Sequence, residues 1–311
     1  MATEAEPTLA GVFPAPTEQE WLEQVEKVLK GAPVSKLHSS TPDGIDVAPL
    51  YTRSTSPGGA DEAGFPGSLP FTRGTHEELD ADTPWGLRAV AEHPDPAEAN
   101  RRLLQDLERG ATSVEVRFDE AFRTGVAPSA DGFDQLGGVD GVLVAGADDL
   151  QSLLAGVLLD VAPVHLRPGA EYTRAALLLT GVWERAGVAA GDRIGGFGAD
   201  PLGHLAQTGR LPQGVDAALA ELGALAARTA SALPGVRTVS VDVTPYVEAG
   251  AGETQELAAM LATGAAYLRA LSSAGLSADD ACRQIEVTLT ADADVFTTIA
   301  KLRAARRVWA A

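Results

Sequence analysis

The stretch that decides the fold is VDAALAELGALAARTASA (Val215–Ala232), which is followed after five residues by the short run TVSVDV (238–243). The first segment is rich in Ala and Leu and is long enough for a helix, whereas the second is dense in β-branched valine and predicts a strand. A helix that leads directly into a short apolar strand is typical of one repeat of an α/β fold.

The same alternation begins near residue 95 and continues to the end of the chain. Strands are predicted at 113–118, 141–144, 161–166, 193–197, 238–243 and 285–289. Helices are predicted at 95–109, 148–158, 173–187, Val215–Ala232, 254–274 and 295–309. This spacing predicts right-handed βαβ units and a parallel sheet. Six such units fit either a doubly wound sheet or part of an eightfold barrel, and periodicity does not separate the two.

The N-terminal third differs in composition and periodicity from the rest of the chain. Thr17 and Glu20 have the spacing of a capping box, and they open an amphipathic helix that ends at Gly31. Residues 39–74 are rich in Pro, Gly, Ser and Thr and show no sustained period. We therefore predict an N-terminal helix and extended arm over residues 1–94, which would wrap a partner, and β/α units over residues 95–311.

Composition excludes several classes of function. The 311 residues include 43 acidic and 24 basic side chains, a formal charge of -19, so nucleic acid and anionic membranes are unfavourable partners. No apolar stretch reaches the roughly 20 residues that span a bilayer. The single cysteine, Cys282, allows neither an internal disulfide nor a cysteine metal site, and we expect it to be a small buried residue. These features fit a cytoplasmic protein.

Familiar catalytic and metal-binding motifs are missing from the sequence. The five histidines are scattered without metal-ligand spacing, and no G-x-S-x-G, P-loop or well-spaced G-x-G-x-x-G occurs. His165, on a predicted strand, is interpreted as structural rather than catalytic. The basic run 301–307 is interpreted as a solvated helix face. We expect no metal site.

Three segments carry a family resemblance. They are the arm motifs PLYTR (49–53), GFPG (64–67), PFTRG (70–74) and PW (84–85), then EAGA (248–251), and finally the last helix, from Phe296 through AKLRAAR (300–306) to Trp309. In these features the chain resembles the methylmalonyl-CoA mutase family. The resemblance implies a parallel (β/α)8 TIM-type barrel, here apparently cut after about six units, through which the pantetheine arm of coenzyme A passes in active members.

The resemblance also shows which working residues of active members are replaced. The substrate-contacting tyrosine, glutamine, arginine and histidine correspond to Val90, Gly198, Thr208 and Pro245. Positions that hold coenzyme A correspond to Glu115, Gln284 and Glu286, where the acidic residues would repel a polyphosphate. The family residue is kept at Arg88 and Phe118, and both residues can equally be structural. We therefore expect no catalytic residue in this chain.

The resemblance implies a non-catalytic small subunit that forms a heterodimer with a large catalytic mutase subunit. The large subunit would hold the adenosylcobalamin and interconvert succinyl-CoA and (R)-methylmalonyl-CoA. This chain has no D-x-H-x-x-G string, so we expect it to bind no cobalamin. Two alternatives are an active mutase for another acyl-CoA and a free-standing acyl-CoA-binding or assembly protein. Because the chain stops after the sixth helix, we expect a longer full-length version.

Overall fold

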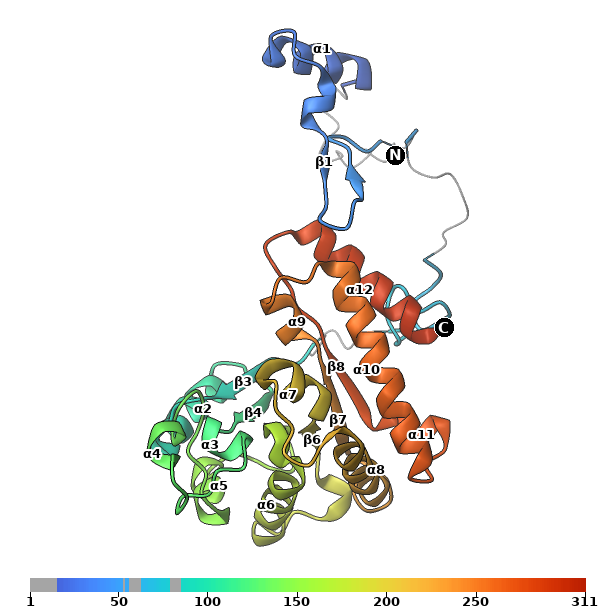
Figure 1. The fold of residues 1–311 in the computed structure, drawn as a ribbon. Coiled ribbons are helices and arrows are strands. Elements are labelled where there is room, and N and C mark those ends of the chain that lie inside the picture. The colour runs from blue at the N-terminus through green and yellow to red at the C-terminus, as the bar shows by residue number, and fades with distance from the viewer. Residues whose placement is uncertain (1–15, 53, 56–62, 79–84) are drawn as a thin grey trace, which may run out of the picture. The chain divides into compact units, whose positions relative to one another are not determined.

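The computed structural model describes residues 16–52, 54–55, 63–78 and 85–311 (Figure 1). The chain divides into two compact units, one of residues 1–62 and one of residues 63–311. The boundary that the sequence predicts between the arm (1–94) and the β/α units (95–311) stays a prediction.

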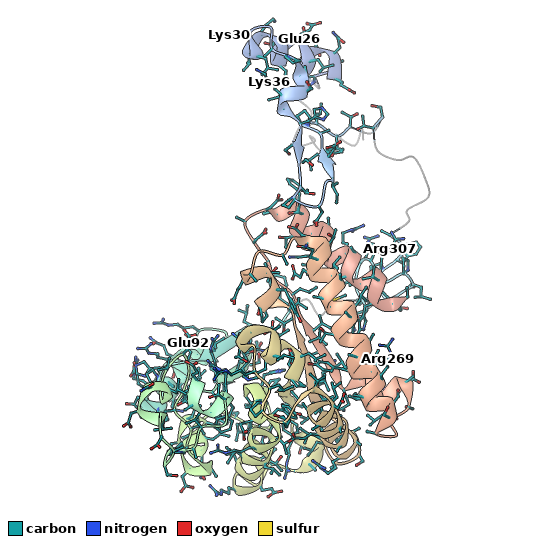
Figure 2. All side chains as sticks on the ribbon, viewed as in Figure 1. Glu26, Lys30, Lys36, Glu92, Arg269 and Arg307 are labelled. Atoms are coloured by element: carbon teal, nitrogen blue, oxygen red, sulfur yellow. The ribbon has the colours of Figure 1, made fainter. Side chains whose placement is uncertain are left out.

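The first unit contains one helix and a small hairpin. Helix α1 (Glu18–Leu29) begins with the predicted capping box, in which the Thr17 side chain accepts from the Glu20 amide and the Glu20 carboxylate accepts from the Thr17 amide. The short helix η1 (Val34–Leu37) leads to strands β1 (Ser39–Ser40) and β2 (Asp46–Val47), which pair antiparallel. None of the residues of α1 is buried, and charged side chains such as Glu26 and Lys30 project from it (Figure 2).

The second unit is built on a six-stranded parallel sheet. Its strands are β3 (Arg88–Ala91), β4 (Ser113–Arg117), β5 (Val164–Arg167), β6 (Gly195–Ala199), β7 (Val236–Asp242) and β8 (Ile285–Thr288). They pair in simple chain order from β3 to β8, each parallel to the next. A doubly wound sheet reverses its order at a switch point, whereas a barrel adds each strand to the same side of the last. The order therefore favours the barrel type.

The strand predictions were wrong at two places. Residues 141–144 form no strand of the sheet, and only Val142 makes an isolated bridge, to Phe118. Gly141 packs so closely on the backbone that a Cβ there would lie 2.3 Å from the Phe118 carbonyl oxygen, so the chain touches β4 at one point and then turns away. Strand β3 was not predicted, because Arg-Ala-Val-Ala is short and half alanine, which has low strand propensity.

The long helices form one continuous layer. Helices α2 (Pro96–Glu108), α5 (Ala147–Leu153), α6 (Tyr172–Arg185), α8 (Val215–Ala232), α10 (Glu253–Ser273) and α12 (Val295–Ala310) each contact the next in this series, and α2, α6, α8 and α10 also pack on strands (Figure 1). Arg269 and Arg307 project from the outer sides of α10 and α12 (Figure 2). All six helices are present where they were predicted, but α5 ends at Leu153, five residues before the predicted end at residue 158.

Shorter helices join these elements. They are α3 (Glu120–Arg123), α4 (Phe133–Leu136), η2 (Gly169–Glu171), η3 (Ala190–Asp192), α7 (Pro201–Thr208), α9 (Thr244–Glu248) and α11 (Ala278–Arg283). Three of them, α3, α7 and α9, follow directly on β4, β6 and β7, so they stand at the carboxyl ends of the strands. Active sites of β/α barrels are found at this end.

The two faces of the sheet differ in chemistry because successive side chains of a strand point to opposite sides. The helix-facing side is apolar and fully buried, with Val114, Val116, Val164, Leu166, Val239 and Val241 at its centre. Burial of this surface supplies the main stabilisation of the fold. The opposite side, which we call the inner face, carries Arg88, Glu115, His165, Arg167, Asp242 and Glu286.

Contacts across the inner face show that the sheet is curled. Strands β3 and β8 are its two edges, five strand spacings apart, which is about 24 Å in a flat sheet. Yet Arg88 Nη2 on β3 lies 3.7 Å from Glu286 Oε2 on β8. Only a sheet that bends round toward a barrel brings its edges within reach of two side chains.

Candidate functional site

The inner face is held together by ion pairs that cross several strands. Arg88 donates to Glu115 Oε2 at 3.3 Å, and Arg167 Nε lies 3.0 Å from Glu115 Oε1. Arg167 also donates to Asp242 Oδ2 at 2.6 Å, although β6 lies between their two strands. His165 Nδ1 lies 3.4 Å from Glu286 Oε2. These cations and carboxylates therefore neutralise one another within the protein.

The lowered pKa of Glu286 agrees with this pairing. Burial by itself raises the pKa of this carboxyl group, but the neighbouring His165, Arg88 and Arg237 together bring it below the ordinary value. Glu286 is therefore ionised at neutral pH.

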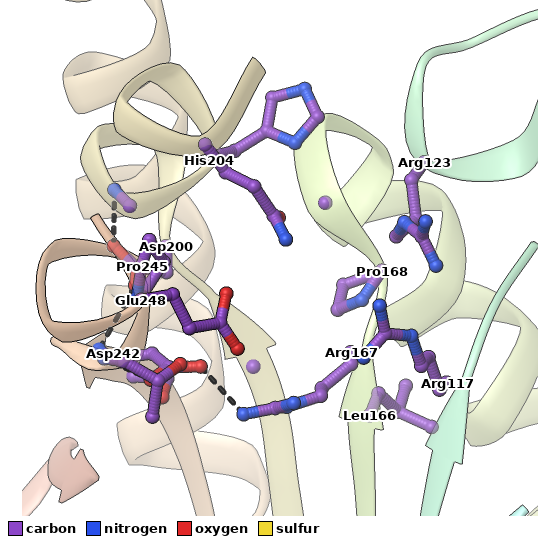
Figure 3. Close-up of a pocket in the computed structure, with 16 residues that line it drawn as sticks. Arg117, Arg123, Leu166, Arg167, Pro168, Asp200, His204, Asp242, Pro245 and Glu248 are labelled. Atoms are coloured by element: carbon purple, nitrogen blue, oxygen red, sulfur yellow. Dashed lines mark hydrogen bonds and ion pairs between the residues drawn. The ribbon is translucent and has the colours of Figure 1, made fainter. Parts of the chain in front are cut away.

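A cavity of about 120 Å³ opens at the carboxyl ends of β4 to β7 (Figure 3). Arg117 and Arg167 come from the last positions of β4 and β5, and Asp242 from the last position of β7. Figure 3 shows the guanidinium groups on one side of the cavity and the carboxylates of Asp242 and Glu248 on the other. The wall is polar, but Arg167 and Asp242 are already paired with each other.

Asp200 is the most perturbed carboxyl group of this cavity. It follows β6 and caps α7, where its side chain accepts from the Gly203 amide at 2.9 Å, from the Asp242 amide at 3.0 Å and from the Tyr267 hydroxyl. Complete burial raises its pKa to about 6, and the three donors oppose this rise. Because these donors already occupy the carboxylate, it is poorly placed to act as a general base.

His204 lies beside Asp200 on α7. The residue is 6% exposed, and burial together with the charge of Arg123 lowers the pKa of its imidazole, which is neutral at pH 7. His204 lines both this cavity and a neighbouring one of about 660 Å³, which also contacts Thr208. The imidazole is thus part of the wall between two cavities.

The structure brings some of the sequence-predicted positions together and separates others. Gly198 and Pro245 both line the 120 Å³ cavity, whereas Thr208 lies at the exposed end of α7 and lines only the larger one. Val90 is 45% exposed on β3. Phe118 is fully buried and stacks on Phe122 with ring centroids 4.2 Å apart, so its place is in the core.

The backbone at Gly198 excludes a side chain. Its φ is +63°, in the left-handed region, and a Cβ would lie 1.8 Å from the Leu166 carbonyl oxygen. The β6–β7 register shifts between Gly196 and Ala199, which places this irregularity within the strand. The glutamine implied by the family resemblance therefore cannot occupy this backbone conformation.

The other family positions have structural partners. Gln284 is buried and accepts from the Thr238 hydroxyl at 2.7 Å and the Thr238 amide at 3.2 Å. Glu115 and Glu286, predicted to repel a polyphosphate, are paired with Arg88, Arg167 and His165. Arg88 is the retained family residue at the centre of these contacts. Of the arm motifs, Arg53 and Pro84 lie outside the described residues.

Two expectations about single residues were wrong. Lys301, predicted on a solvated helix face, is 4% exposed and its Nζ donates to Glu256 Oε2 at 2.6 Å. The sequence of α12 mixes Lys, Leu and Arg, so it does not indicate which cation points inward. No local signal identifies Glu256, 45 residues away, as the partner of Lys301. Cys282 is exposed rather than buried, because α11 buries Ala281 instead.

Sequence reasoning also missed three polar residues that line the cavity. Asp200 was visible only as the last residue of the GFGAD string, Asp242 was seen as a strand residue without a role, and Arg167 lay just beyond a predicted strand. A polar residue at the end of each predicted strand was the available signal, since those ends converge in a β/α fold.

No helix in the part of the chain that the structure describes is long and apolar enough to cross a membrane. Across residues 16–52, 54–55, 63–78 and 85–311, no group of three or more His, Cys, Asp or Glu side chains is placed to hold a metal ion.

Parallel strands in chain order, a curled sheet and a polar cavity at the carboxyl strand ends define an α/β protein of the barrel type. The family model described as methylmalonyl-CoA mutase matches residues 40–311. The chain belongs to the methylmalonyl-CoA mutase family.

The similar proteins include mutase small subunits. The methylmalonyl-CoA mutase small subunit of Streptomyces virginiae is 41% identical over 311 residues, which cover 97% of this chain and 46% of the relative. That of Propionibacterium freudenreichii subsp. shermanii is 37% identical, covering 97% and 44%. The probable small subunit of Mycobacterium bovis is 33% identical, covering 89% and 40%. The chain thus spans less than half the length of these relatives.

The titration of Asp200 gives a first testable prediction. The folded-state pKa of about 6 exceeds the ordinary value of 3.8, so the folded chain binds more protons than the unfolded chain between about pH 4 and 6. Stability from this group is fully present below pH 4 and is lost as the pH rises through 6. A shift of about two units corresponds to about 3 kcal/mol.

We expect the stability gap between the wild-type chain and Asp200→Asn to shrink by about that amount from pH 4 to pH 7.5 in urea titrations. Asp279→Asn, at an exposed helix start, is the control and should leave the gap independent of pH. A constant gap for Asp200→Asn would contradict the assignment.

Proposed function

We propose that this chain is a non-catalytic small subunit of an adenosylcobalamin-dependent methylmalonyl-CoA mutase. In this proposal it forms a heterodimer with a large catalytic subunit that interconverts succinyl-CoA and (R)-methylmalonyl-CoA. We also propose that the six units belong to an eight-stranded barrel and that the protein is cytoplasmic. The names of the similar small subunits support the assignment.

The main support for the proposal is the set of residues that line the cavity at the carboxyl ends of the strands. Gly198 cannot bear a side chain, and Pro245 at the start of α9 offers neither a donor nor an acid. Arg167, the guanidinium that lines the cavity between them, is paired with Asp242 and Glu115. No described side chain at these positions is free to polarise a thioester or to hold a substrate carboxylate.

The same residues do not fit the cofactor that the family uses. A cavity of about 120 Å³ is far smaller than a corrin ring system. Neither nearby histidine is free to serve as a ligand: His165 contacts Arg88 and Glu286, and His204 is only 6% exposed in the wall between the two cavities. We therefore propose that any adenosylcobalamin of the complex is held by the partner subunit.

The arm supplies the surface that a partner would cover. Helix α1 is amphipathic, yet Trp21, Val25 and the other apolar residues of its face are all at least partly exposed, and Val28 is 78% exposed. Such a face is typical of a helix that docks in a groove of another protein. We propose that residues 1–94 wrap the large subunit, apart from β3, which pairs with β4 in the sheet.

Co-expression with a large mutase subunit tests the function. We expect a one-to-one complex by mass measurement, turnover of methylmalonyl-CoA by the complex with adenosylcobalamin, and none by this chain alone. Turnover by this chain alone would overturn the proposal and favour an active mutase. Failure to form a complex, with binding of acyl-CoA by the isolated chain, would favour a free-standing binding protein.

Variants of α1 test its role in the complex. We expect Trp21→Ala/Val25→Ala to weaken the complex at least about tenfold, because aromatic anchors dominate binding energy at interfaces. Glu23→Ala/Lys27→Ala, on exposed positions of the same helix, is the control and should change the affinity little. Loss of stability of the isolated chain, with unchanged affinity, would show that α1 covers its own barrel instead.

A further inference from the structure

The inner face carries one cluster of charged and polar side chains whose centre is Arg88. The guanidinium of this residue reaches three partners on three other strands. These are Glu115 Oε2 on β4 at 3.3 Å, His165 Nε2 on β5 at 3.0 Å and Glu286 Oε2 on β8 at 3.7 Å. One side chain of the first strand therefore contacts the last strand across the interior of the curled sheet.

The contacts of His165 fix its tautomer. A guanidinium only donates hydrogen bonds, so Nε2 must accept from Arg88 and carry no proton. The proton of the neutral ring is then on Nδ1, which faces Glu286 Oε2 at 3.4 Å. The imidazole thus accepts a hydrogen bond from Arg88 on one side, and on the other its Nδ1 lies close to Glu286 without forming a regular hydrogen bond.

Gly196 on β6 makes room for this arrangement. A Cβ at this position would lie 2.9 Å from His165 Nδ1 and 3.1 Å from Glu286 Oε1, closer than ordinary contacts. Gly196, unlike Gly198, is not in the left-handed region, so its backbone conformation is open to any residue. The requirement for glycine here is one of space.

The carboxylates of the cluster are paired without a ligand. Arg88 lies against Glu115 and Glu286, and Arg167 lies against Glu115 and Asp242. Buried charges are costly unless they are paired, and here each carboxylate has its partner inside the sheet. An extended ligand that entered along the inner face would have to separate such pairs.

We propose that Arg88, Glu115, His165 and Glu286, seated over Gly196, form an internal plug that occupies the interior of the curled sheet and excludes an extended ligand such as a coenzyme A thioester. The plug rests on the proposed function, because it explains why this barrel would carry no substrate. It also ties edge strand β3 to edge strand β8. Inactivity then comes from occupied space as well as from missing side chains.

A double-mutant comparison tests the seat of the plug. In the full chain, we expect Gly196→Ala to raise the equilibrium constant for unfolding at least about tenfold, because His165 and Glu286 must move apart. In the background His165→Ala/Glu286→Ser, the same substitution should change it less than about twofold. Gly181→Ala in α6, where a Cβ meets nothing within 4 Å, is the matched control and should not destabilise the chain.

If Gly196→Ala destabilises the wild-type chain and the double variant equally, the plug is overturned. If the double variant does not fold, Glu286→Ser alone is the background, and Gly196→Ala should destabilise it at most half as much as it destabilises the wild-type chain. Calorimetric titration of the wild-type chain with coenzyme A is expected to show no binding at 1 mM, roughly the upper end of ordinary substrate affinities. Binding at this concentration, abolished by Gly196→Ala, would overturn the proposal.

The outcomes separate the plug from the proposed function. An inactive chain that joins a large subunit but shows no coupling between Gly196 and Glu286 would remove the plug and leave the small-subunit role. A chain that turns over substrate alone would remove the small-subunit role whatever the coupling.

Discussion

Replacing Lys301 by methionine is expected to lower the free energy of unfolding by about 3–5 kcal/mol, the usual result of removing one partner of a buried ion pair. The side chains of Lys301 and Glu256 are 2% and 1% exposed, and their charged atoms are 2.6 Å apart. Glu256 would keep its hydrogen bonds from the Thr290 amide and hydroxyl, but it would be a buried anion without a cation. Urea titration at pH 7 measures the loss.

Two further variants separate charge from packing. Lys301→Met/Glu256→Gln removes both charges and leaves an amide oxygen for the Thr290 amide, so it should lose less than half as much. Arg303→Met, exposed on the same helix, should change stability by no more than about 0.5 kcal/mol. A similarly small effect of Lys301→Met would mean that the pair contributes nothing to joining α10 and α12.

Introducing glutamine at Gly198 is expected to destabilise the chain by at least about 3 kcal/mol and to create no binding of acyl-CoA. The residue combines a φ of +63° with a Cβ position 1.8 Å from the Leu166 carbonyl oxygen, so both the backbone of β6 and its pairing with β5 must change. Thermal unfolding and calorimetry with methylmalonyl-CoA measure the two effects.

A matched control isolates the cause. Gly191 lies in the short helix η3 before β6, where a Cβ would meet nothing within 4 Å and φ is not left-handed. The variant Gly191→Gln should therefore fold with nearly wild-type stability. Wild-type stability of Gly198→Gln would show that this stretch of β6 can rearrange. The replacement of glutamine by glycine would then be a simple loss rather than a change of backbone.

Much of the fold could be predicted because its signals are local. The capping box of Thr17 and Glu20 lies within four residues, and Val215–Ala232 is a helix with the predicted ends. Residues 141–144 were misjudged because an apolar run has the same composition whether it makes a full ladder or a single bridge. Strand β3 was missed because its four residues receive their conformation from pairing with β4.

Less of the site could be predicted, because its contacts join distant parts of the chain. The replacements at Gly198 and Pro245 were identified through the resemblance, and both residues do line one cavity. The partners of Arg88 were beyond reach, since Glu286 lies 198 residues away and becomes a neighbour only when the sheet curls. The raised pKa of Asp200 likewise depends on burial, which the hydrogen bond from the distant Tyr267 only partly offsets.

The sequence by itself determined the repeating β/α units, the places of the long helices and the family, because periodicity, caps and motif strings are properties of neighbouring residues. Only the tertiary structure decided the strand order, the curl of the sheet, the pairing of its inner charges and the burial of Lys301. Those features depend on which side chains meet after the chain has folded back on itself, and burial then changes the energy of every charge that meets another.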